Sequence, residues 1–126
     1  MKRALGLLLT VVLMTAACGD DDGGVGSQTD PASASTCGEL ADVTINLLQE
    51  AIDSVSDLSV SEFTDLAEMP EAIARLDIMG EDLDARAGDL GCSAEDAQAL
   101  TCERIGRLEA HSEVAQLILF GIAGSC

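Results

Sequence analysis

The apolar residues of segment 69–90 recur in alternating steps of four and three, which is the spacing of a single stripe along an α-helix. The stripe consists of Met69, Ile73, Leu76, Gly80, Leu83, Ala87 and Leu90. A segment with this period is expected to pack as a helix against other helices. Gly80 and Ala87 are small, so we expect a partner helix to approach the stripe closely at these two positions.

The rest of the chain beyond Thr36 also has helical periodicity. Aromatic residues make up only 2% of the chain, so a core must consist of Leu, Ile, Val, Ala and Met, which suits packed helices better than a sheet. We therefore predict an all-α fold for residues 37–126, a small antiparallel bundle of about four helices. The expected helical segments are 40–58, a short one at 60–68, 70–90, 94–108 and 114–122, the last being strongly apolar and expected in the core.

Local signals place the ends of these helices. Ser and Thr residues followed three positions later by an acidic residue form possible capping boxes. Pro70 suits the first position of a helix, and Gly91 suits the position after its end. The capping pairs are Thr36–Glu39, Ser59–Glu62 and Ser93–Asp96. Acidic residues also stand four positions before arginines in the pairs Glu71–Arg75, Asp82–Arg86 and Glu103–Arg107, which we expect to stabilise exposed helix faces.

Five cysteines in a short chain suggest covalent cross-links. If Cys18 is set apart, the other four can form two disulfides, in three possible pairings. Cys37 begins the first helix and Cys92 follows the end of the long one, so antiparallel neighbours would bring them together. Cys126 can then fold back onto Cys102. We favour Cys37–Cys92 with Cys102–Cys126, while zinc binding is the weaker alternative because close C-x-x-C pairs are absent.

The first residues have the order of a secretory signal peptide. Lys2 and Arg3 precede an apolar run at residues 4–14, and small residues then lead to Cys18. The apolar run is too short to cross a bilayer comfortably as a permanent helix. An ordinary signal peptide cleaved after Ala17 would leave Cys18 as a free thiol.

The segment Ala16-Ala17-Cys18-Gly19-Asp20-Asp21 resembles the processing site of bacterial lipoproteins, and more broadly the small acidic lipoproteins of high-GC actinobacteria. The resemblance implies that residues 1–17 are a lipoprotein signal peptide and that Cys18 carries a diacylglyceryl anchor, including palmitate. Cys18 would then become the first residue of a mature protein held on the outer face of the cytoplasmic membrane. Residues 83–92 also resemble these small acidic lipoproteins, and they lead into the expected helix capped by Ser93.

Charge separates the N-terminus from the remainder. The net charge is −17, and all 23 acidic residues follow Cys18. Such a surface repels nucleic acid, which we do not expect as a partner. Residues 18–36 are rich in Gly, Ser and Asp with little apolar surface, so we predict a disordered acidic tether after the lipidated cysteine.

No pattern of catalytic, metal-ligating or cofactor-binding residues stands out. The single histidine, His111, lies between Glu109 and Glu113, near an expected break between helices. We therefore expect a non-enzymatic protein without cofactors. Two functions remain: a helical interaction module that meets another envelope protein, or a carrier that holds an apolar molecule or lipid between helices where Gly80 and Ala87 thin the packing. An exposed apolar patch would favour the first, and an internal pocket the second.

Overall fold

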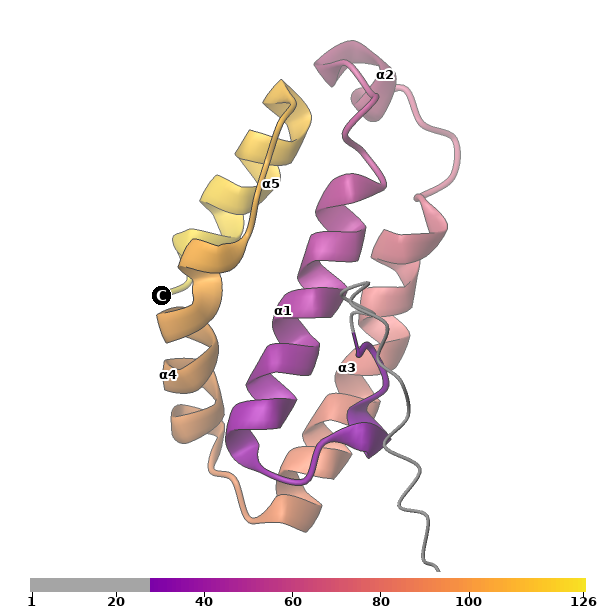
Figure 1. Ribbon diagram of the computed structural model, residues 1–126. Coiled ribbons are helices and arrows are strands. Elements are labelled where there is room, and N and C mark those ends of the chain that lie inside the picture. Colours follow the sequence, from indigo (N-terminus) through magenta and orange to yellow (C-terminus); the bar gives the residue numbers. More distant parts are fainter. Residues whose placement is uncertain (1–27) are drawn as a thin grey trace, which may run out of the picture.

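The fold is a helical bundle built around one central helix (Figure 1), as the computed structural model describes for residues 28–126. The elements are η1 (Pro31–Ser33), α1 (Cys37–Asp53), α2 (Val60–Thr64), α3 (Glu71–Leu90), α4 (Ala94–Arg104), η2 (Ile105–Arg107) and α5 (Glu113–Ala123). The described residues contain no strand, so the all-α prediction is confirmed. The predicted signal peptide and Cys18 lie outside the described residues.

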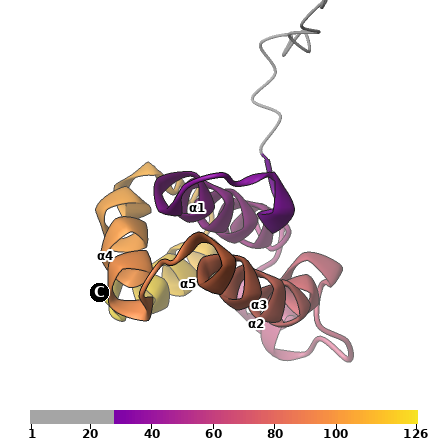
Figure 2. The same cartoon turned by 90° about the horizontal axis from the view of Figure 1, so that it is seen from below.

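Helix α1 lies between α3 on one side and a column formed by α4 and α5 on the other (Figures 1 and 2). Helix α4 packs beside the N-terminal half of α1, and α5 lies along the C-terminal half. The expected four-helix bundle is thus modified, because two short helices placed end to end take the position of one long helix. The short α2 lies at the far end and contacts α5.

Two separate groups of buried residues line opposite sides of α1. One group packs against the partly buried Leu76, Met79, Leu83, Ala87 and Leu90 of α3; it consists of Ala34, Leu40, Val43 and Leu47. The other packs against the apolar residues of η2 and α5; it consists of Ile45, Ile52, Leu108 and Ala115. We call them the α3-side core and the α5-side core. Each residue of α1 is rotated by about 100° from the one before, so residues two positions apart, such as Val43 and Ile45, face opposite sides.

The helix ends follow the sequence signals in part. Ser59 and Glu62 form a complete capping box, while Thr36 and Ser93 each accept one backbone N–H. Gly91 has a φ of 72°, in the left-handed region, and donates its N–H to Gly88 O. The N–H of Cys92 bonds to Ala87 O, which completes a Schellman motif at the end of α3.

Four of the expected boundaries are wrong. Helix α4 ends at Arg104, where the 3-10 helix η2 takes over, instead of continuing to Leu108. The other three differ for local reasons. Helix α1 ends at Asp53 rather than near Leu58, because the Ser54 and Ser56 hydroxyls donate to backbone carbonyls three residues earlier. Helix α2 stops at Thr64, where the side chain makes the same kind of bond to Ser61 O. Pro70 is the N-cap of α3 rather than its first residue.

Residues 28–36 differ from the expected free tether. Asp30 caps η1 by accepting the N–H of Ala32, and Pro31 is buried. Ala34 belongs to the α3-side core, and its carbonyl accepts two hydrogen bonds from Arg86, at 3.0 and 2.6 Å. This segment is therefore a strap that packs on α3 and α1. The strap stays packed although it buries few apolar atoms, because Arg86 donates hydrogen bonds to the Ala34 carbonyl.

Candidate functional site

Helices α3 and α4 stand apart on either side of α1 and leave a groove of about 720 Å³ between them. Thr44 and Leu48 of α1 form its floor. Both residues lie on the strip of α1 between the two cores, as their positions on the helix require. The Thr44 hydroxyl donates to Leu40 O within the helix, so it does not leave an unpaired polar group on the floor.

The walls of the groove consist mainly of small and apolar residues. On α3 they are Gly80, Leu83, Asp84, Ala87 and Gly88, and on α4 and beyond they are Ala94, Ala97, Gln98, Thr101, Cys102, Ile105, Ile122, Ser125 and Cys126. A Cβ added at Gly80 or Gly88 would meet no atom within 4 Å. The groove therefore exists because these side chains are too small to fill the space between the walls.

Only one of the two small residues of the sequence stripe has the predicted effect on packing. Ala87 packs against the α3-side core and also borders the groove, whereas no helix approaches Gly80 closely, and Gly80 only lines the groove. The larger stripe residues Leu76, Leu83 and Leu90 also pack on the α3-side core, and Met79 joins them from outside the predicted stripe. Met69, the first residue of the stripe, is 59% exposed.

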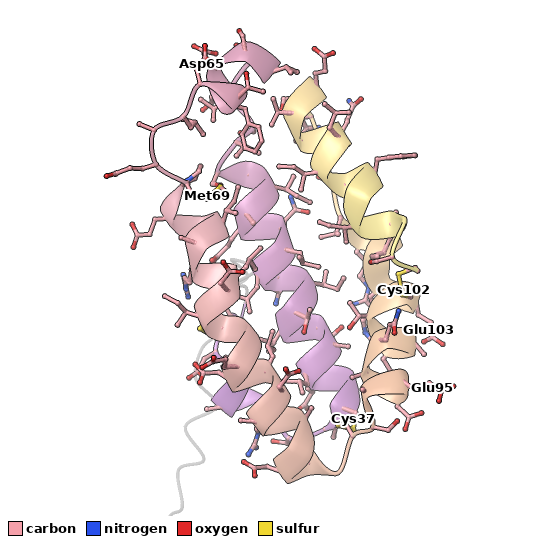
Figure 3. The ribbon with its side chains drawn as sticks, turned by 180° about the vertical axis from the view of Figure 1, so that it is seen from behind. Cys37, Asp65, Met69, Glu95, Cys102 and Glu103 are labelled. Carbon is pink, nitrogen blue, oxygen red and sulfur yellow. A yellow bond between two sulfur atoms is a disulfide. The ribbon has the colours of Figure 1, made fainter. Side chains whose placement is uncertain are left out.

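Two disulfides hold the elements that border the groove. Cys37 is joined to Cys92 and Cys102 to Cys126, which is the pairing favoured from the sequence. The first bond links the start of α1 to the end of α3; Figure 3 labels Cys37 at the start of α1 and Cys102 on α4. The second bond ties the segment after α5 to α4, where Gln98 also donates to Ser125 O at 3.0 Å.

The arginines pair between elements rather than along one helix. Asp42 of α1 accepts hydrogen bonds from Arg104 at 2.7 Å and Arg107 at 2.8 Å. Arg75 reaches Glu50 of α1 at 3.3 Å, and Arg86 bonds to the strap. The predicted pairs four residues apart are therefore absent among the described ion pairs, because each guanidinium has a partner on a neighbouring element that it can reach.

These arginines leave the groove without a positive charge. Asp42 and Glu50 lie on the side of α1 opposite Thr44 and Leu48, and no arginine is among the groove-lining residues. Exposed carboxylates remain on the groove side of α3. Asp77, Glu81 and Asp84 follow each other at steps of four and three, so they form one stripe along the rim.

Helix α5 is not the buried helix that its composition suggested. Val114 and Ala115 are buried, but Phe120 is 80% and Leu117 58% exposed. Only one side of α5 faces α1, and no other described element covers the opposite side. Leu117 and Phe120, three residues apart, thus form a small apolar surface on the outer side of the bundle.

The remaining candidates show no reactive geometry. His111 and Glu109 are both highly exposed and lie 3.4 Å apart, with no serine or cysteine nucleophile paired to the imidazole in the described part of the chain. Within residues 28–126, no three His, Cys, Asp or Glu side chains gather closely enough to hold a metal ion. In the same range, no helix has both the length and the apolar character needed to span a membrane.

Comparisons with protein-family models, with curated proteins and with solved structures find no match to this chain. The site must therefore be interpreted from its own geometry. The sequence indicated Gly80 and Ala87 but not the α4 wall, where Ala94, Ala97 and Thr101 recur at steps of three and four. That spacing of small residues was the available signal.

Proposed function

We propose that this protein is an extracytoplasmic lipoprotein, anchored in the membrane through Cys18, whose helical domain is a non-catalytic interaction module. The groove between α3 and α4 is its binding site. The observation that carries this proposal is the groove itself, a recess of about 720 Å³ with a largely apolar lining. Its volume lies within the range typical of ligand sites.

The two disulfides support a binding role. Cys37–Cys92 holds the α3 wall against α1, and Cys102–Cys126 holds α4 to the segment after α5, so a ligand would meet one fixed wall and one internally rigid wall, which lowers the entropic cost of binding. A carrier of an apolar small molecule is the second candidate, favoured by the same volume. The exposed walls argue against it, because Gly88, Ala94 and Gln98 are all open to solvent, and a fully apolar ligand would stay partly in water.

A photo-crosslinking amino acid placed in the groove tests the interaction module in the producing cell. At Gly88, where added atoms meet no neighbour, we expect a cross-link to one discrete protein. The matched control is Ala85, which lies on the same helix but on the strap side. Equal cross-linking at both positions would contradict the proposal. A stoichiometric apolar molecule extracted from the native protein would instead support the carrier.

The proposed anchor has its own test. Intact-mass measurement of the protein from the membrane fraction should show acyl chains on Cys18, and Cys18→Ser should release the protein into the medium. Two acyl chains are needed because one chain binds membranes only marginally. A mature N-terminus other than Cys18, or an unmodified thiol there, would refute this part of the proposal.

A further inference from the structure

We infer that the groove receives a basic amphipathic helix from another protein. This inference rests on the proposed interaction function and adds the chemistry of the partner. It depends on three observations: the shape of the groove, the size of the residues in its walls, and the sign of the charges around it.

The shape fits a helix placed alongside three others. Helix α1 forms the floor and α3 and α4 the walls (Figures 2 and 3). A helix lying between the walls would pack beside α1, α3 and α4, with the end of α5 and the C-terminal residues at one end of the groove. From Gly80 to Gly88 the α3 wall is about 12 Å long at the usual helical rise, which matches about two turns of a partner helix.

The small residues of the walls permit a backbone to enter. Gly80, Ala87 and Gly88 on one side and Ala94 and Ala97 on the other present little side-chain volume. A partner helix can therefore place an apolar face against Leu48 and Ile105 while its polar back stays in water. This is the usual mode of helix-in-groove recognition, and it solves the problem that the open walls pose for a fully apolar ligand.

The charges select a positive partner. Asp84 lines the groove, the exposed Asp77 and Glu81 share its face of α3 by helical spacing, and no cation is among the groove-lining residues. The four arginines of the described chain make their contacts on the strap or on the opposite side of α1. A second copy of this acidic chain, or an anionic lipid, would be repelled, whereas Lys or Arg residues flanking an apolar stripe complement the rim.

The test uses a model peptide of 14 leucines and lysines with one apolar stripe, and the same peptide with glutamate in place of lysine. Titration calorimetry with the full disulfide-bonded chain should detect the lysine peptide only, with an affinity that falls as salt rises. Gly80→Leu should place a side chain in the groove, because the space next to Gly80 is open to an added Cβ. We expect binding about tenfold weaker in this variant.

Gly121→Leu is the matched control, since it adds the same side chain to α5 at a position with equal free space outside the groove. It should bind the peptide as the parent chain does. Both leucines replace glycine within a helix, so neither variant should lose helicity, which circular dichroism checks. Equal weakening in both variants, or none in Gly80→Leu, would overturn the inference.

A second pair of variants separates local from general electrostatics. E81Q/D84N removes two charges from the rim, and D82N/D89N removes two from the strap side of the same helix. We expect about fivefold weaker binding in the first and no change in the second. Equal losses would mean attraction by net charge alone and would overturn the inference. If no lysine peptide binds although Gly88 cross-links in cells, the charge assignment fails while the proposed function stands.

Discussion

The two sides of α1 are built differently. On one side, a single long helix, α3, packs on α1 and is joined to it directly by Cys37–Cys92. On the other side, the two shorter helices α4 and α5 both pack on α1. Their disulfide joins them to each other but not to α1. The α3 side is therefore held by a covalent bond, whereas the α5 side depends on buried apolar contacts and on the ion pairs of Asp42.

This difference bears on the groove, which lies between the two sides. One wall is fixed to the floor, and the other is a stapled unit that can shift relative to α1 without breaking a covalent bond. We therefore expect opening motions to occur at the α4–α5 wall.

The largest effect is expected from removing the disulfides. Closing 55 residues by Cys37–Cys92 stabilises the fold by about 4 kcal/mol in the chain-entropy model, and closing 24 residues by Cys102–Cys126 by about 3.5 kcal/mol. Urea unfolding of the paired serine variants measures both losses. Hydrogen exchange should show that the Cys102/Cys126 variant loosens α5 but leaves α3 protected; equal loosening of both helices would contradict the contrast.

Matched truncations in the two cores come next. Leu47 of the α3-side core and Ile52 of the α5-side core are almost fully buried, so Leu47→Ala and Ile52→Ala should each cost about 3 kcal/mol. Because α5 has no covalent bond to α1, Ile52→Ala should speed amide exchange in α5 more than in α3. Leu47→Ala should not produce this asymmetry, since Cys37–Cys92 keeps α3 in place.

Ion pairs across the two sides differ in expected strength. Asp42 accepts from two arginines, of which Arg104 is only 17% exposed, so Asp42→Asn should destabilise the protein by about 1 kcal/mol. Glu50 pairs with one exposed arginine on the α3 side, and Glu50→Gln should cost less than about 0.5 kcal/mol. Thermal unfolding of the two variants measures the difference, and a larger loss in Glu50→Gln would break the comparison.

The smallest effect concerns pH at α2, which touches α5. Hydrogen bonds from the Ser59 hydroxyl and then from its backbone N–H lower the pKa of Glu62 below its ordinary value of 4.5. The carboxylate thus supports the cap fully above that ordinary value, and the support is lost as the pH falls through the lowered pKa. NMR titration of the Ser59 amide should show α2 fraying in acid, and Glu62→Ala should remove the pH dependence; an unchanged titration in that variant would contradict it.

Much of the fold was predictable because its signals are local. The α3 stripe, the Gly91 stop and the Ser59 cap depend on neighbouring residues, and the disulfide pairing follows once α1 and α3 are antiparallel. The arginine pairs were predicted wrongly because their partners, such as Asp42 and Glu50, are distant in sequence. Helix spacing alone cannot indicate such contacts.

The groove was only half predictable for the same reason. Gly80 and Ala87 stood out by interrupting a stripe of larger residues, but whether a neighbouring helix fills the gap depends on where α4 lies. The exposure of Phe120 depends likewise on tertiary arrangement, since α5 has the composition of a core helix but a place at the edge. The sequence of a fully apolar helix does not indicate which of its faces will be buried against other helices.

The strap has a mechanical consequence. A pull on the chain ahead of Gln28 enters the fold through the bond from Asn46 to Gln28 O and the grip of Arg86 on Ala34 O. From there the load passes to α1 and α3, which Cys37–Cys92 clamps as one unit. The α4–α5 column lies off this load path. Tension on the chain ahead of Gln28 would therefore be borne by α1 and α3, which Cys37–Cys92 joins. The α4–α5 wall of the groove would stay unstrained.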